Sequence, residues 1–268
     1  MNPLRGLMLK FNKTMHNLKE EEIKKEELVP PQKLNSFVGG GDFKQIGEEF
    51  FKYFVELGSL KPNQRVLDVG CGTGRMAVPL MNYLDQKGSY EGFDIDSACI
   101  DWCKKNISPK CPTFNFQRAD IYNKLYNPGG KYKAREYKFP YIDESFDFVF
   151  LTSVFTHLLP EDMENYLAEI ARVLKRDGAC LITFFLANEE SLSLIQSGQS
   201  SLNFLKQSEK YLVVNVDRPE DAVAYDEPFV LNLYEKYGLK IKQPLHYGSW
   251  CGRKDFLSYQ DVIVASKQ

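Results

Sequence analysis

Apolar residues recur along the chain at two spacings, one typical of strands and one typical of amphipathic helices. From residue 61 onward, short apolar runs alternate with segments whose apolar positions lie three or four residues apart. Strands that alternate with helices are typical of a parallel sheet with helices on both faces. The predicted strands are 65–69, 89–94, 113–118, 146–152, 179–186, 240–247 and 259–266, and the predicted helices between them are 75–84, 97–106, 161–174 and 227–237.

Two segments depart from this alternation. Residues 1–35 include eight charged side chains in the nine residues 19–27, a composition that cannot bury a core and predicts a charged N-terminal arm. Residues 187–224 are rich in serine and contain one extended stretch. We predict that 36–268 form a single domain with an insertion at 187–224. That insertion, together with the arm, forms a lid over a site or else covers an apolar edge.

Composition narrows the possible functions. With 34 basic and 36 acidic side chains the formal net charge is −2, which excludes an all-over basic nucleic-acid coat. We find no apolar run of the roughly 18 residues needed to span a membrane and no signal-peptide pattern, so no membrane association is expected. The six cysteines lack CxxC spacing, which favours reduced thiols, a cytoplasmic location and no metal site.

The strongest local motif is Val66-Leu67-Asp68-Val69-Gly70-Cys71-Gly72-Thr73-Gly74, at the end of the first predicted strand. Glycines in such a turn allow a ligand to lie against the backbone, and Cys71 is small enough to share it. The spacing is GxGxG, whereas dinucleotide-binding turns have GxGxxG. The acid ahead of the turn, Asp68, would repel a pyrophosphate but suits an ammonium or sulfonium ligand.

This motif resembles the first motif of the class I, Rossmann-like methyltransferases that depend on S-adenosylmethionine. The resemblance extends over about residues 37–266. Further matching positions are Asp94 after the second strand, Asp120-Ile121 after the third, Phe146-Asp147 in the fourth, and the helix end at 173–178. It implies a doubly wound, seven-stranded mixed α/β sheet whose last strand is antiparallel, with helices on both faces.

The resemblance also implies where S-adenosylmethionine would bind. Asp94 is expected to accept both ribose hydroxyls, Asp120 to meet the adenine amino group, and Ile121 to lie on the adenine ring. Asp68 either contacts the cofactor or is a structural carboxylate that accepts hydrogen bonds from nearby amides. The predicted cofactor-binding residues are Asp68, Gly70, Cys71, Gly72, Gly74, Asp94, Ile95, Asp120, Ile121 and Thr152.

Two histidines are candidates for acid–base chemistry. His157 lies just past the fourth strand, and imidazole titrates near neutral pH, so it is the first candidate for a base that removes a hydroxyl proton. The alternative is a histidine that only binds its own loop. His246, near the end of the sixth strand, is the second candidate.

Residues 247–256 are predicted to bring substrate-binding groups over the cofactor, because the last connection of the sheet lies on that side. Trp250 would stack on a sugar or aromatic acceptor, Arg253 would bind a carboxylate or phosphate, and Tyr247 lies beside them. The alternative is a hairpin in which Trp250 packs into the core and Arg253 is paired structurally. This tail resembles uncharacterised bacterial methyltransferases, several of them associated with glycan or natural-product genes.

The sequence thus predicts a methyltransferase of the EC 2.1.1 class that uses S-adenosylmethionine and acts on a small-molecule acceptor. O-methylation of a sugar-like or secondary-metabolite hydroxyl is favoured. The alternatives are a small-molecule N-methyltransferase and a non-catalytic S-adenosylmethionine-binding protein. No nucleic-acid partner is expected, because residues 151–154 lack an Asn/Asp-Pro-Pro-Tyr motif and the only basic stretch with aromatic residues is 131–138.

Overall fold

The computed structural model describes residues 28–37, 39 and 41–268. Most of the predicted N-terminal arm, residues 1–27, therefore lies outside the described residues. The described part begins with α2 (Gln32–Phe37) and α3 (Phe43–Glu56). Asp42 caps α3 by accepting a hydrogen bond from the amide of Gln45, as expected of an acidic N-cap residue.

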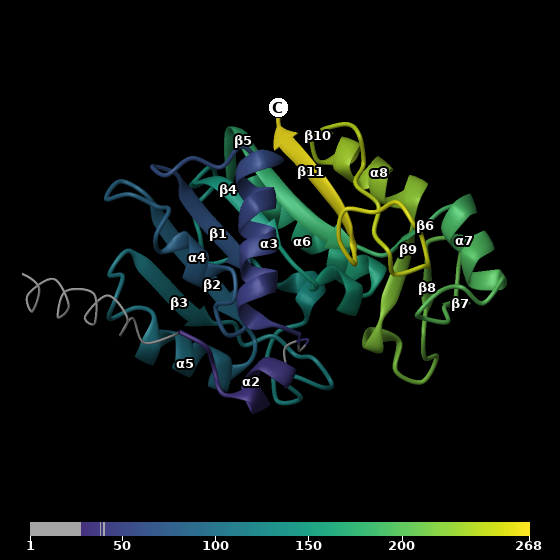
Figure 1. The fold of residues 1–268 in the computed structure, drawn as a ribbon, viewed down its shortest axis with the longest axis horizontal. Coiled ribbons are helices and arrows are strands. Elements are labelled where there is room, and N and C mark those ends of the chain that lie inside the picture. The colour runs from purple at the N-terminus through teal and green to yellow at the C-terminus, as the bar shows by residue number, and fades with distance from the viewer. Residues whose placement is uncertain (1–27, 38, 40) are drawn as a thin grey trace, which may run out of the picture.

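A seven-stranded mixed sheet forms the centre of the protein (Figure 1). The strand order is β10-β11-β5-β4-β1-β2-β3. β11 is antiparallel to both of its neighbours, and the other pairs are parallel, which confirms the predicted sheet. The strands are β1 (Arg65–Val69), β2 (Ser89–Asp94), β3 (Phe114–Arg118), β4 (Phe146–Leu151), β5 (Leu174–Phe184), β10 (Leu239–Ile241) and β11 (Asp261–Lys267).

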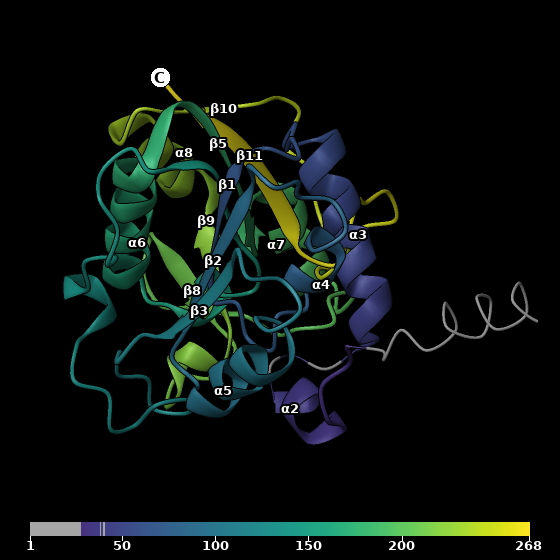
Figure 2. The same ribbon diagram turned by 90° about the vertical axis from the view of Figure 1, so that its left-hand side faces the viewer.

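Helices cover both faces of this sheet, as Figure 2 shows for α3 and α6. One face carries α3, α4 (Ala77–Leu80) and α5 (Ser97–Asn106), and the other carries α6 (Pro160–Val173) and α8 (Glu227–Lys236). Neighbouring residues of β1 point to opposite faces, so Val66 packs with the α3 side and Leu67 with the α6 side. The ring of Phe54 in α3 stacks on Phe150 in β4 with centroids 4.3 Å apart.

A second, smaller sheet lies beside the first, with strand order β6-β9-β8-β7 (Figure 1). Its strands are β6 (Leu186–Ala187), β7 (Leu205–Lys206), β8 (Tyr211–Val213) and β9 (Val223–Asp226). The helix α7 (Glu189–Gln196) follows β6 in the chain. We call residues 186–226 the accessory segment; it contains the insertion predicted at 187–224. In the described part of the chain, three short 3₁₀ helices complete the fold: η1 (Ala134–Glu136), η2 (Phe155–His157) and η3 (Pro219–Asp221).

Three predicted element boundaries were wrong. The helix predicted at 75–84 is reduced to α4, because the glycine turn continues to residue 76 and the chain after Leu80 forms turns. The strand predicted at 240–247 ends at Ile241, and Pro244 has no amide hydrogen with which to extend a ladder. β5 begins at Leu174, where a helix end was predicted, since Leu174 pairs with Phe146 before residues 175–178 leave the register.

Within the described residues no helix combines the length and apolar character needed to cross a membrane.

Candidate active site

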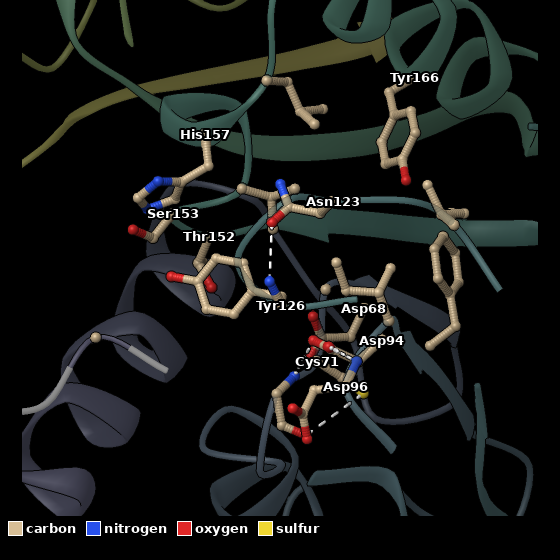
Figure 3. Close-up of a pocket in the computed structure, with 18 of the residues that line it drawn as sticks. Asp68, Cys71, Asp94, Asp96, Asn123, Tyr126, Thr152, Ser153, His157 and Tyr166 are labelled. Carbon is tan, nitrogen blue, oxygen red and sulfur yellow. Dashed lines mark hydrogen bonds between the residues drawn. The ribbon is translucent and has the colours of Figure 1, made fainter. Parts of the chain in front are cut away.

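A cavity of about 540 Å³ opens at the carboxyl ends of β1, β2 and β4 (Figure 3). This is where ligands bind in open α/β sheets. Asp68, Asp94 and Thr152, at the ends of three strands, all line it. The glycine turn forms one wall, and residues that follow β4 form another.

The glycine turn presents backbone to the cavity. Gly70 has a φ of 84°, and a Cβ there would lie 2.3 Å from Cγ2 of Val154, so a side chain at this position would be both strained and obstructed. Gly70, Cys71 and Gly72 line the cavity. Gly74 does not: a Cβ there would lie 2.5 Å from Cδ1 of Ile107. The lack of a side chain at Gly74 serves packing against the end of α5, and its predicted contact with the cofactor stays a prediction.

Asp94 is held in one orientation by the backbone. One carboxylate oxygen accepts a hydrogen bond from the backbone amide of Gly72, and the other accepts one from the backbone amide of Asp96, both at 2.8 Å. Burial raises the pKa of Asp94, and these amide hydrogen bonds oppose that effect. Each carboxylate oxygen has two acceptor positions, so both remain able to accept a ligand hydroxyl.

Asp68 has an unsatisfied carboxylate oxygen at the cavity wall. Its Oδ2 accepts the Tyr90 hydroxyl at 2.6 Å, whereas its buried Oδ1 has no hydrogen-bond partner among residues 28–37, 39 and 41–268. Burial raises the pKa of Asp68 to about 8, and the nearby charge of Asp94 adds to the increase. An unpaired buried acceptor is costly, so this oxygen is suited to a ligand that brings a donor or a positive charge.

The wall expected to hold an adenine ring is only partly as predicted. Ile95 and Ile121 line the cavity, and so does Thr152. Asp120 does not line it; its side chain is 48% exposed and lies 4.0 Å from Arg118. The predicted contact between Asp120 and the adenine amino group is therefore not supported: the carboxylate faces solvent while the backbone carbonyl of Asp120 accepts two amides from the loop that returns at 131–132.

His157 lines the cavity at the end of η2, near Thr152 and Ser153 in Figure 3. Its Nδ1 lies 2.9 Å from the carbonyl oxygen of Glu220. A carbonyl only accepts hydrogen bonds, so Nδ1 carries the proton and Nε2 of the neutral ring keeps its lone pair. Burial lowers the pKa of His157, which favours that neutral form.

The predicted substrate residues near the C-terminus lie elsewhere. Neither Tyr247, Trp250 nor Arg253 lines the cavity, and neither does the second candidate base, His246. The indole of Trp250 is fully buried in the core, and its Nε1 donates to Asp261 at 2.7 Å. His246 makes backbone hydrogen bonds with β11.

The reason is a buried polar network around Asp261, the first residue of β11. Arg253 is 6% exposed and binds Asp261 at 3.2 Å and Glu190 at 2.7 Å. The hydroxyl of Tyr247 donates to Glu227, and the guanidinium of Arg253 lies 4.5 Å from the ring centre of Tyr247. The predicted substrate roles of these residues were wrong: Trp250 packs into the core and Arg253 is paired structurally, as in the alternative, although the segment is a loop and not a hairpin.

Other cavity residues were not predicted as site residues. The loop after β3 contributes Asn123 and Tyr126, α6 contributes Asp162 and Tyr166, and the accessory segment contributes Glu220. α3 adds Ile46, Glu49 and Phe50, and the last loop adds residues 258–260. Ile46 and Phe50 lie four residues apart, a spacing typical of the apolar face of a helix, and this spacing gives no sign that the face borders a ligand site. Among the described side chains, no group of three or more His, Cys, Asp or Glu residues is placed to hold a metal ion.

Comparison with known proteins gives consistent results. Residues 67–182 match the family described as "Methyltransferase domain". A probable cobalt-precorrin-6B C(15)-methyltransferase (decarboxylating) from Thermoplasma acidophilum is 27% identical over 164 residues, which are 58% of this chain and 73% of that protein. A tRNA N(3)-cytidine methyltransferase from Gallus gallus is 29% identical over 122 residues, which are 44% of this chain and 29% of that protein.

A solved structure has the same fold. Magnesium protoporphyrin IX methyltransferase from Synechocystis PCC 6803, with bound SAH (S-adenosylhomocysteine), superposes with a TM-score of 0.53. The match covers 87% of this chain and 92% of that one at 14% sequence identity. At such low identity the likeness shows the shared fold alone.

Proposed function

We propose that the chain is a class I, Rossmann-like methyltransferase that uses S-adenosylmethionine, and that it methylates a small-molecule hydroxyl with His157 as the base. One observation carries the proposal: Nδ1 of His157 is bound to a carbonyl oxygen, which leaves Nε2 as the free proton acceptor in a ring that lines the cavity. A hydroxyl must lose its proton during methyl transfer, and a base of this kind removes it.

The residues present fit the cofactor. The unpaired Oδ1 of Asp68 would accept a hydrogen bond from the α-ammonium group of the cofactor. The fixed carboxylate of Asp94 would accept hydrogen bonds from its ribose hydroxyls. Gly70 leaves the backbone open to the ligand, and Ile95 and Ile121 would contact the adenine ring. When bound, S-adenosylmethionine supplies a methyl group already activated on sulfonium, so the task of these residues is to hold the reacting atoms in line.

The state of His157 favours a hydroxyl over an amine. Burial lowers its pKa, so at neutral pH the ring is ready to accept a proton. A neutral amine needs no base to be methylated, which would leave this arrangement without a use. Polar Ser153 and Gln260, which hydrogen-bond each other at 3.0 Å, and aromatic Tyr126 line the cavity near His157. This mixed lining is suited to a sugar-like or secondary-metabolite acceptor.

A small-molecule amine is the second candidate. Asp162 and Glu220 both line the cavity, and burial raises the pKa of each. Where they are ionised, carboxylates at that wall would attract an ammonium acceptor, which must lose its proton before it is methylated. We place the reaction in the cytoplasm, because all six cysteines are free thiols.

The proposal is tested by incubating the protein with S-adenosylmethionine and a panel of sugars, phenols, other alcohols and amines, and measuring SAH formation. We expect turnover with a hydroxyl acceptor. His157→Gln should then lower kcat by about 10²–10⁴-fold, the usual contribution of a general base. The affinity for SAH should stay unchanged.

Unchanged turnover in His157→Gln with a hydroxyl acceptor would contradict the base role. Turnover only with amines, insensitive to His157→Gln, would favour N-methylation. SAH binding without turnover on any acceptor would favour the non-catalytic alternative.

A further inference from the structure

η2, the short helix that carries His157, is anchored by the accessory segment. The hydroxyl of Tyr225, in β9, lies 2.6 Å from the carbonyl oxygen of Leu158 and 3.0 Å from that of Phe155. Tyr225 is fully buried, and its ring packs edge-on against Phe184 of β5. These contacts fix the backbone on both sides of His157 relative to the small sheet.

The accessory segment also contacts the imidazole itself. The carbonyl group that accepts the Nδ1 proton belongs to Glu220, in η3, 63 residues away in the chain. Of the described residues in the accessory segment, Glu220 alone lines the cavity. The segment therefore reaches the site mainly through His157 and does not form a broad cover over it.

We propose that the accessory segment is the positioning element of the base, in which Tyr225 fixes η2 and the Glu220 carbonyl holds His157 in the form that carries its proton on Nδ1. This inference rests on the proposed function, since it concerns the same histidine. Tyr225 is a positioning residue, because it touches neither the cavity nor the reacting atoms. Without these contacts, the ring would be free to exchange between its two neutral forms.

The first test is read from the wild-type protein, and a variant serves only to assign the signals. The chain has three histidines, so NMR of the ¹⁵N-labelled imidazoles resolves each ring, and the signal lost in His157→Gln identifies His157. At a pH where the ring is neutral, we expect a protonated, pyrrole-type Nδ1 and an unprotonated, pyridine-type Nε2. A proton on Nε2, or averaged signals from both forms, would overturn the inference.

The second test uses a matched pair of tyrosines. Tyr225 and Tyr234 are both fully buried and both contact Phe184, with ring centroids 6.4 and 6.3 Å away. The Tyr234 hydroxyl has no hydrogen-bond partner within the described part of the chain. Tyr225→Phe should therefore lose the single-form His157 signals, whereas Tyr234→Phe should keep them.

Wild-type signals in a folded Tyr225→Phe would overturn the role of Tyr225. If that variant does not fold, the wild-type spectrum still decides whether Nδ1 carries the proton. Failure of the proposed function is seen separately: the expected spectrum together with full turnover in His157→Gln would support the positioning and contradict the base role.

Discussion

The two halves of the cavity are built in different ways. The half that we propose binds the cofactor, called the cofactor half, consists of Asp68, the glycine turn at 70–72 and Asp94, which lie at the ends of two adjacent parallel strands. The half that we propose binds the acceptor, called the acceptor half, combines His157 with α3, η3 and residues 258–260, which come from widely separated parts of the chain. Local motifs therefore define the first half, and tertiary packing defines the second.

This difference separates what is shared from what is particular to this chain. The cofactor half depends on backbone geometry and two carboxylates, which any sequence with the same strand ends can supply. The acceptor half depends on how the accessory segment and the last loop dock on the sheet. We therefore expect substitutions in the cofactor half to change SAH binding, and substitutions around Asp261 and His157 to leave it unchanged.

The largest effect on binding is expected for Asp94→Ala. Loss of its charge-assisted hydrogen bonds to the ribose should weaken SAH binding by about 1–3 kcal/mol, or about 5- to 150-fold, in calorimetry. Asp120→Ala is the matched control, because Asp120 is an acid at the end of the next strand that does not line the cavity. Equal losses in both variants, or none in Asp94→Ala, would contradict the assignment.

A smaller effect, on stability alone, is expected for Trp250→Phe. Phenylalanine can still pack against Phe185 and Phe204 but cannot donate to the buried carboxylate of Asp261. The free energy of unfolding should fall by about 1–3 kcal/mol in urea titrations, with SAH affinity unchanged. Wild-type stability with an altered acceptor KM would restore a substrate role for Trp250.

The smallest effect on binding is the release of a proton from Asp68. Its raised pKa, about 8, means that the free protein holds a proton there at pH 7, and a bound ammonium group would displace it. SAH binding at pH 7 should therefore release up to about one proton, measured by calorimetry in buffers of different ionisation enthalpy. The release should fade above pH 8 and be absent in Asp68→Asn.

The same carboxyl makes stability depend on pH. Between the ordinary pKa of 3.8 and about 8, the folded chain keeps a proton at Asp68 that the unfolded chain has lost. Its contribution to stability therefore decreases as pH rises through this window. Asp68→Asn should flatten that decrease, and an identical pH profile in both proteins would contradict the raised pKa.

The sequence was sufficient to predict the sheet and most of the residues that line the cavity at the ends of β1 and β2. Strand periodicity and the GxGxG motif are local, and Asp68, Gly70 and Asp94, which they single out, all line the cavity. Gly74 and Asp120 belong to the same motifs but do not line the cavity. Whether a residue next to a ligand turn faces the ligand, a helix or solvent depends on its neighbours in space.

The loop before β11 shows most clearly what could not be predicted from the sequence. Trp250 and Arg253 are residue types that bind sugars and anions well, and nothing in their local sequence excludes that role. Their position is decided by Asp261, a buried carboxylate eight residues beyond Arg253, and by Glu190 in the accessory segment. Such a network is a property of the folded chain and has no periodicity that a sequence could reveal.

The central claim is tested most directly by a crystal structure of the protein with SAH. We expect the ribose hydroxyls within hydrogen-bond distance of Asp94, the ammonium group on Oδ1 of Asp68, and the sulfur facing the part of the cavity that His157 lines. SAH bound in this cavity with its ribose away from Asp94, or bound outside the cavity, would contradict the account.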